Sequence, residues 1–566
     1  MKLKRALLGA ACAFALAPAA HADRGTDGEV KLTFPQAVSL MNPYLSAGTK
    51  DVYGASLVLE PLAGFDDQGV LVAKLAAEIP TLENGGISED LTSITWKLIP
   101  GLMWSDGTAV TAEDAVFSAA YCMDPAGGCA QATKYDGVAK VEAVDASTVK
   151  VTFTGPKPNP YTAFVGAQAP LIQKAQFAAC LGAAAPTCTD QNNMPIGTGP
   201  FRVTGFTVND TVSFEANPNY RDPAKPAFAT AVIKGGGDAE GSARAVMETG
   251  EFDYAWNTQI PPDSQAAMTA AGKGQFVVAF GTLVERIEIN LTDPSADLPD
   301  SERSTLKHPH PVLSDMKVRT ALSKAIDRAI LVEVGYGAAG APTCNVIPAP
   351  EAWVSDNTDC LAQDIEGAKA LLDEAGWMVG ADGIREKDGK KLHILYQTTV
   401  NPVRQDFQAL IKDWWTEIGV DVELKAVDPS VFFGADAGSP DTYQKFYADV
   451  EMFANNSDMP DPETYLGQYQ CSKIPSPETQ WQGENMNRYC DPAYEAKFAE
   501  LTQTRDIAAR QALAKELNNM VSKDTMTVIP LVHRGALSAH SNTLGGVKIN
   551  AWDSQMWNIA DWFRVK

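Results

Sequence analysis

Residues 95–108 read TWKLIPGLMWSDGT, and residues 111–118 continue as TAEDAVFS. The first residues alternate between polar and apolar side chains, as in a strand. Residues 93–98 could pair with the strand-like residues 149–153. Trp104, Asp106 and Gly107 then mark a turn with an aromatic plug. Thr111 is a good N-cap and Asp114 follows three residues later, as in a capping box. The stretch therefore predicts a strand, a tight corner and a short helix.

The flanking chain divides into two parts of different character. Residues 57–212 are rich in strand patterns joined by turns. After about residue 291 helices alternate with strands. Apolar side chains form one helical stripe over residues 314–333 and another over 403–419, and residues 420–424 alternate as a strand. A chain of 566 residues with this alternation is predicted to be an α/β protein with more than one lobe.

The N-terminus is typical of an export signal. A basic segment at residues 2–5 precedes an apolar core at residues 6–17, and small residues then lead to Ala22. We expect residues 1–22 to be a cleaved signal peptide and the protein to lie in the periplasm. A lipid-anchored alternative would use Cys12, but Gly9 stands where a large aliphatic residue is expected.

Charge and cysteine content are consistent with export. The formal net charge is −24, and the leader contains three basic residues and no acid, so nucleic acid is not expected as a partner.

Without Cys12, eight cysteines remain, and neighbours in sequence are the easiest to join. Because Cys-x-x-Cys spacing is absent, zinc is not expected. The predicted disulfides are Cys122 with Cys129, Cys180 with Cys188, Cys344 with Cys360, and Cys471 with Cys490.

Catalytic signatures are scarce. The mature chain has five histidines and contains no His-Glu-x-x-His pair, no Gly-x-Ser-x-Gly elbow and no phosphate-binding Gly-rich loop. His308 and His310 lie in a polar loop, and no metal role is expected for them. Carboxylate pairs are abundant, so counting does not exclude a glycosidase. The sequence favours a binding protein without catalysis, with a secreted hydrolase as the alternative.

Seven motifs in order carry a more specific resemblance. Residues 95–118 are followed by motifs at residues 197–201, 217–226, 249–253, 315–322, 325–328 and 371–377. Together they resemble the family 5 extracellular solute-binding proteins, the dipeptide, oligopeptide and nickel class that serves ABC importers. The resemblance implies a two-lobed, type II periplasmic-binding-protein fold that closes on its ligand like a Venus flytrap, with an extra inserted subdomain.

The same resemblance implies the domain boundaries and the role. Lobe I would comprise residues 23–61, 195–289 and 526–566, with residues 62–194 inserted as a subdomain and residues 290–525 forming lobe II. A monomer without cofactor would capture a peptide in the cleft and deliver it to an inner-membrane permease. An oligosaccharide, an opine or a nickel complex are the alternative ligands.

Five residues are the candidate ligand contacts. Arg404 lies at the start of the helix at 403–419, where a guanidinium and the helix N-terminus both favour a carboxylate. In peptide-binding relatives an arginine at this position binds the ligand's carboxylate, and an aspartate at the position of Asp458 binds its ammonium. Asn455 and Asn456 could instead bind sugar hydroxyls or an amide. Trp256 either forms a wall of the cleft or packs in the core.

Overall fold

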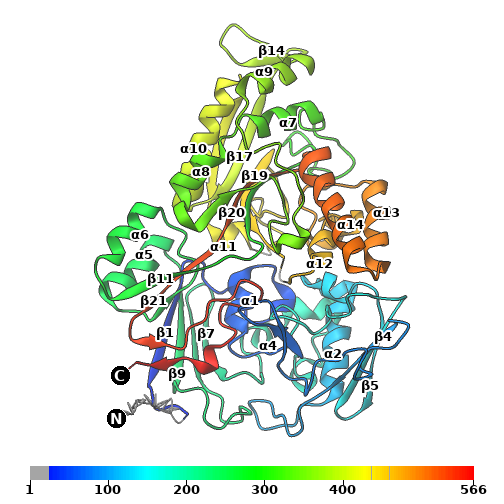
Figure 1. Cartoon of the computed structure of the whole chain (residues 1–566), viewed down its shortest axis with the longest axis vertical. Coiled ribbons are helices and arrows are strands. Elements are labelled where there is room, and N and C mark those ends of the chain that lie inside the picture. The colour runs from blue at the N-terminus through cyan, green and yellow to red at the C-terminus, as the bar shows by residue number, and fades with distance from the viewer. Residues whose placement is uncertain (1–23, 435, 458, 566) are drawn as a thin grey trace, which may run out of the picture.

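The computed structural model describes residues 24–434, 436–457 and 459–565. The predicted signal peptide and Asp458 lie outside the described residues. The chain forms two lobes, one above the other in Figure 1, each built on its own mixed sheet. No helix in the described part of the chain has the length and apolarity that a membrane crossing requires.

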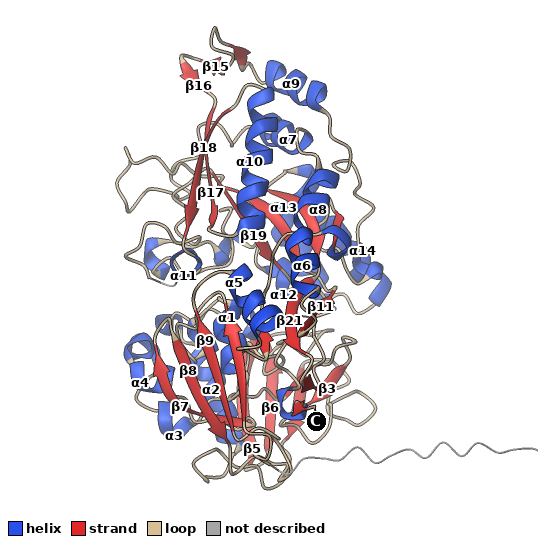
Figure 2. Ribbon diagram, turned by 90° about the vertical axis from the view of Figure 1, so that its left-hand side faces the viewer, coloured by secondary structure: helices blue, strands red, loops and turns tan. Residues whose placement is uncertain are grey.

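The lower lobe, lobe I, is built on a seven-stranded sheet in the order β11-β21-β10-β1-β9-β8-β7. Figure 2 shows β9, β8 and β7 of this sheet running side by side. The strands are β1 (Glu29–Phe34), β7 (Phe201–Thr207), β8 (Thr211–Ala216), β9 (Thr230–Gly235), β10 (Tyr254–Ala255), β11 (Gly274–Ala279) and β21 (Ala536–Ser541). Helices α1 (Thr49–Ala55), α5 (Ala239–Arg244) and α6 (Pro262–Thr269) and the two-stranded pairs β2 (Ala63–Phe65) with β3 (Leu71–Ala73) and β22 (Leu544–Gly545) with β23 (Phe563–Arg564) complete it.

A subdomain is inserted in lobe I between β3 and β7. Its sheet has the order β4-β6-β5, and β4 pairs with β6 in antiparallel register. Its elements are β4 (Ser93–Lys97), β5 (Val138–Asp145), β6 (Thr148–Phe153), α2 (Ala112–Met123), α3 (Lys174–Phe177) and α4 (Thr189–Asn193). One continuous apolar core joins the subdomain to lobe I.

The corner predicted at residues 104–114 is present. Thr111 caps α2, and the Asp114 carboxylate accepts a hydrogen bond from the Thr111 backbone N–H at 2.9 Å. The indole of the buried Trp104 donates to the same carboxylate at 3.4 Å. Nearby, a Cβ at Gly197 would lie 1.9 Å from the carbonyl oxygen of Val58, so only glycine fits where the two backbones cross.

The upper lobe, lobe II, has a separate core and a six-stranded sheet in the order β13-β20-β12-β19-β17-β18. Its strands are β12 (Val284–Ile289), β13 (Gly340–Pro342), β17 (His393–Thr399), β18 (Asp421–Val427), β19 (Val450–Asn455) and β20 (Val528–Arg534), with β14 (Met378–Val379), β15 (Arg385–Lys387) and β16 (Lys390–Lys391) in a small sheet at the tip. Its helices are α7 (Met316–Lys324), α8 (Arg328–Gly335), α9 (Ile365–Glu374), α10 (Pro402–Glu417), α11 (Pro429–Phe432), α12 (Glu463–Gly467), α13 (Pro492–Gln503) and α14 (Ile507–Asn519).

Two sequence-based expectations differ from this arrangement. The apolar stripe at 314–333 is divided between α7 and α8, because the Asp327 carboxylate caps α8 by accepting from the Ala329 and Ile330 backbone N–H groups. The expected boundaries placed β12 and β20 in lobe I, whereas both pair in the lobe II sheet. The chain therefore changes lobe at residues 280–283 and at Gly535.

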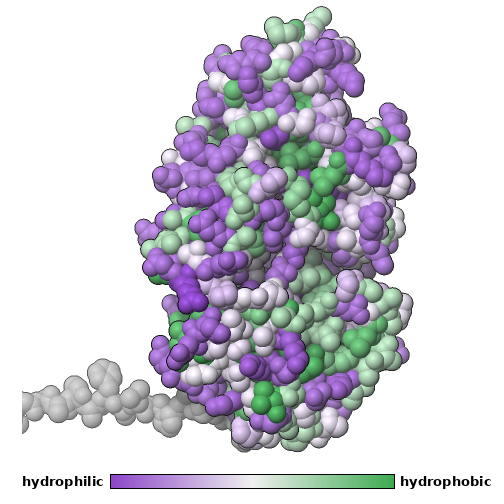
Figure 3. Space-filling model, turned by 90° about the vertical axis from the view of Figure 1, so that its right-hand side faces the viewer, coloured by the Kyte–Doolittle hydropathy of each residue, from purple (hydrophilic) through white to green (hydrophobic). Residues whose placement is uncertain are grey.

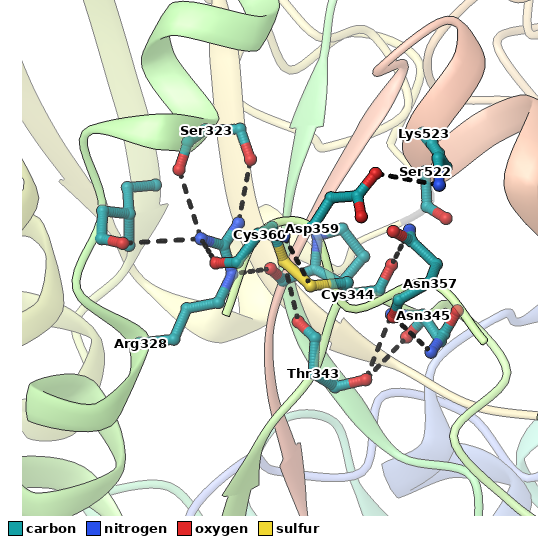
Figure 4. Close-up of a disulfide and its surroundings, with 12 residues drawn as sticks. Ser323, Arg328, Thr343, Cys344, Asn345, Asn357, Asp359, Cys360, Ser522 and Lys523 are labelled. Atoms are coloured by element: carbon teal, nitrogen blue, oxygen red, sulfur yellow. Dashed lines mark hydrogen bonds and ion pairs between the residues drawn. A yellow bond between two sulfur atoms is a disulfide. The ribbon is translucent and has the colours of Figure 1, made fainter. Parts of the chain in front are cut away.

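The structure contains the four local disulfides expected from the sequence. Each lies within the inserted subdomain or within lobe II, so none of the four joins the lobes. Figure 4 shows Cys344–Cys360 beside the buried Arg328, whose guanidinium donates to the carbonyls of Cys360 and Pro530, each at 2.8 Å. This bridge therefore fixes a loop against α8 and β20.

The outer surface is mainly polar. In the face shown in Figure 3, hydrophilic groups cover much of the upper lobe, while paler, more apolar groups gather on the lower lobe.

Candidate functional site

A cavity of about 1020 Å³ separates the two lobes. It is lined from lobe I by Trp256, from the inserted subdomain by residues 131–136, and from lobe II by Arg404 and residues 453–457. Arg534, at the chain crossing next to Gly535, also lines it. Its volume lies at the upper end of the roughly 300–1,000 Å³ of small-molecule sites.

Arg404 lines the cavity from the first turn of α10. The Asn401 side chain caps this helix by accepting a hydrogen bond from the Arg404 backbone N–H at 3.1 Å. The guanidinium is 4% exposed; its Nε lies 2.6 Å from Glu285 Oε1, and its two Nη atoms contact Glu285 at 3.4 Å and Thr399 Oγ1 at 3.0 Å. Every nitrogen of the fork therefore already has a protein partner.

Glu285 is shared by a second arginine. It is fully buried on β12, with Arg534 Nε at 3.3 Å and the Tyr336 hydroxyl donating at 3.0 Å. Burial by itself would raise the pKa of Glu285, but Arg404 and Arg534 together lower it below its usual value. Two guanidinium groups around one ionised carboxylate leave a net charge of +1 in the wall of the cavity.

Arg534 supplies the part of this cluster that is open to a ligand. It is 4% exposed and lines the cavity, and its Nε lies against Glu285. No hydrogen bond of its two Nη nitrogens is found within residues 24–434, 436–457 and 459–565, and its Cζ lies 5.7 Å from the ring centroid of Tyr336. Sequence reasoning missed Arg534, because a single arginine at the end of a strand carries no motif.

Trp256 has both of the roles that the sequence left open. It lines the cavity, yet it is only 4% exposed and belongs to the lobe I core. Its ring centroid lies 5.0 Å from that of Phe34 and 5.7 Å from that of Tyr53. Trp256 thus forms part of the cavity wall, and its indole packs against Phe34 and Tyr53.

Asn455 and Asn456 line the cavity where β19 ends. The Asn455 amide donates to Gln468 Oε1 at 3.1 Å, and its oxygen accepts from the Asn456 backbone N–H at 2.9 Å. Both are partly buried. The cavity wall therefore offers amide groups next to the segment that contains Asp458.

The inserted subdomain and lobe II touch at the far side of the cavity. Thr133 Oγ1 donates to Glu484 Oε1 at 3.1 Å, and Lys473 Nζ lies 3.0 Å from Asp136 Oδ1. The buried pair Lys157–Glu463 adds a third contact at 3.3 Å. The structure therefore has its lobes in contact around the cavity.

The described residues contain no group of three or more His, Cys, Asp or Glu side chains placed to hold a metal. None of the five histidines in the described residues lines the cavity. The polar lining combines guanidinium, ammonium, carboxylate and amide groups with many hydroxyl groups, and this mixture suits the binding of a polar molecule.

Comparisons with known proteins agree on one family. Residues 71–476 match the family described as "Bacterial extracellular solute-binding proteins, family 5 Middle". The glutathione-binding protein GsiB of Escherichia coli K12 is 24% identical over 510 residues, which are 89% of each chain. Protein XP55 of Streptomyces lividans is 28% identical over 389 residues, covering 68% of this chain and 64% of XP55.

Solved structures share the fold. AppA, the oligopeptide-binding protein of Bacillus subtilis in complex with a nonapeptide, has a TM-score of 0.81 at 19% identity, covering 96% of this chain and all of AppA. NikZ of Campylobacter jejuni in complex with Ni(L-His) has a TM-score of 0.79 at 21% identity, covering 95% and 99%.

Proposed function

The chain belongs to family 5 of the bacterial extracellular solute-binding proteins, the substrate-binding components of ABC importers, and on that premise we propose that it captures peptides. The peptide lies in the cavity between the lobes, the lobes close over it, and the closed form delivers it to a membrane permease. The protein acts without catalysis, as a monomer in the periplasm, after loss of residues 1–22.

One observation carries the choice of a peptide: the Arg404–Glu285–Arg534 cluster, with its net positive charge and the unpaired Nη nitrogens of Arg534. A carboxylate bound there restores charge balance in a poorly solvated site, where a charge-assisted bidentate pair is strong. Arg404 thus contributes its positive charge to the cluster through its pair with Glu285. Arg534 directs its Nη nitrogens at the C-terminal carboxylate of the peptide.

The remaining candidate contacts fit the other parts of a peptide. Asp458 binds the ligand's ammonium, Asn455 and Asn456 bind its amide groups, and Trp256 packs against its apolar atoms. The nonapeptide named for AppA and the glutathione named for GsiB support a peptide ligand. The Ni(L-His) named for NikZ makes a nickel complex the competing ligand.

Ligand capture tests the proposal. The protein is unfolded without reductant to strip bound molecules, refolded, and incubated with a peptide pool, an oligosaccharide pool or nickel with L-histidine. We expect only the peptide pool to raise the melting temperature, because a ligand that binds the folded state alone stabilises it. Mass spectrometry then identifies the retained peptides and should find them intact. Stabilisation only by the sugars or by nickel, or peptide hydrolysis, would contradict the proposal.

A further inference from the structure

Lys134 is a buried ammonium in the cavity wall for which no partner is found. It lies in the 3₁₀ helix η3 (Ala132–Tyr135) of the inserted subdomain, is 3% exposed, and lines the cavity. No hydrogen bond or ion pair of its Nζ is present among the described residues. Nζ lies 4.0 Å from the position that a Cβ on Gly166 would take, which places the ammonium beside this glycine.

The helix that carries Lys134 is held firmly. The Gln131 amide donates to the carbonyl oxygens of Pro43 and Ser46, at 3.3 and 2.8 Å. The Tyr135 hydroxyl lies 2.8 Å from that of Tyr44 in the lobe I core. These contacts position the backbone that carries Lys134 before a ligand arrives, which lowers the entropy cost of ordering this wall of the cavity.

The charged neighbours of Lys134 do not neutralise it directly. Asp136 pairs with Lys473, and Glu484 accepts from Thr133; Glu484 is within electrostatic range of Lys134 but forms no ion pair with it. An ammonium in a largely buried residue without a paired anion is unfavourable, and such groups in proteins are normally paired. The missing anion is therefore expected from the ligand.

Resting on the proposed function, we propose that Lys134 binds a second carboxylate of the ligand, so that the preferred peptides are those with a Glu or Asp side chain. The ligand's terminal carboxylate has its own partner in the Arg404–Glu285–Arg534 cluster, which is contributed by lobe II and the chain crossing. Lys134 faces the cavity from the inserted subdomain, so the two cationic sites belong to opposite walls.

The position of Lys134 also connects this carboxylate to closure. The contacts Thr133–Glu484 and Asp136–Lys473 join the lobes on either side of Lys134 in sequence. A carboxylate bound to Lys134 becomes enclosed when these contacts form. An acidic side chain thereby gains a charge-assisted contact that its amide analogue cannot make.

Matched peptides test the proposal by titration calorimetry. The probes are alanine tripeptides with Glu or Gln at the first, second or third position, and their C-terminally amidated forms. The proteins are the wild type, Lys134→Met, Lys134→Gln, Lys134→Arg and the control Lys174→Met, whose lysine is exposed and paired with Glu113 outside the cavity. Thermal unfolding confirms that each variant folds.

We expect the wild type and Lys174→Met to bind a Glu peptide at least about tenfold more tightly than its Gln twin. Lys134→Met and Lys134→Gln should bind both twins with the affinity of the wild type for the Gln peptide, and Lys134→Arg should keep the preference.

A wild type without preference, or a preference that survives Lys134→Met and Lys134→Gln, overturns the assignment while the peptide-binding function stands. If the penalty of C-terminal amidation is lost in Lys134→Met, Lys134 binds the terminal carboxylate and the assignment is wrong. A wild type that binds none of the peptides overturns the proposed function, and the assignment with it.

Discussion

At the scale of single residues, the two cavity arginines should respond differently to substitution. Arg534→Met removes the unpaired Nη nitrogens and should weaken binding of a free-acid peptide by about tenfold to a hundredfold, with little effect on its C-terminal amide. Arg404→Met removes the closest partner of the buried Glu285 and should lower the free energy of unfolding by about 3–5 kcal/mol.

Calorimetry and urea unfolding measure these two effects. Arg202→Met is the control, because Arg202 and Glu215 form a surface pair with both side chains about two-fifths exposed, and its loss should cost about 0–1 kcal/mol. Equal effects of Arg534→Met on the acid and the amide would contradict the carboxylate assignment.

Glu484 should make stability depend on pH. Burial raises the pKa of Glu484 to about 7, against the opposing effect of Lys473; Asp136, Thr133 and Lys134 are its other neighbours. A raised folded-state pKa gives stability that is present at acidic pH and is lost as pH rises towards 7. Glu484→Gln should match the wild type near pH 5 and be more stable than it at pH 8.

Thermal unfolding across this pH range measures the difference between the two proteins. A difference between wild type and Glu484→Gln that is the same at every pH would contradict the assigned titration.

The sequence predicted the position of Arg404 at the start of a helix but not the partners of its guanidinium. The Asn401-Pro402 start of a helix is a local signal, and the structure shows the Asn401 cap. Glu285, which occupies the guanidinium, comes from a strand 119 residues earlier. The Nη nitrogens of Arg534 and the ammonium of Lys134 lack hydrogen-bond partners among the described residues. This is recognised only when the partners of every neighbouring group are known.

At the scale of elements, the Cys344–Cys360 bridge should stabilise lobe II. The cysteines are 16 residues apart, and in the chain-entropy description closing a loop of that size contributes about 3 kcal/mol. The double variant Cys344→Ser/Cys360→Ser should lose about 2–4 kcal/mol of unfolding free energy. Peptide affinity should change little, because neither residue lines the cavity.

Urea unfolding and calorimetry of this variant measure the two quantities. Mass spectrometry of the unreduced wild-type digest is the control for the pairing. An unchanged stability with intact pairing would contradict the structural role of the bridge.

The element pattern was easier to predict than the lobe boundaries. The strand, corner and helix at residues 93–123 follow from local signals: alternation, a turn and a capping box. The chain crossings carry no such signal. Four residues separate β11 from β12, and Gly535 alone separates β20 from β21, so each pair reads as nearly continuous strand. Only the hydrogen-bonded partners show where one lobe ends.

At the scale of the whole molecule, the protein consists of two lobes that share a cavity. Lobe I and the inserted subdomain have one core, and the main core of lobe II is separate. Two chain crossings connect them, together with side-chain contacts that include those at residues 133–136 and 157 and the hydrogen bonds from Gln259 to Glu285 and Tyr336. Separate cores and narrow connections permit hinge closure, in which ligand shifts the balance towards the closed form.

Small-angle X-ray scattering of the stripped protein, with and without a captured peptide, tests this central claim most directly. We expect peptide to lower the radius of gyration and the bound curve to match the structure with its lobes in contact, while the stripped protein is more extended. A radius of gyration that stays the same at saturating peptide would contradict capture by closure of the two lobes.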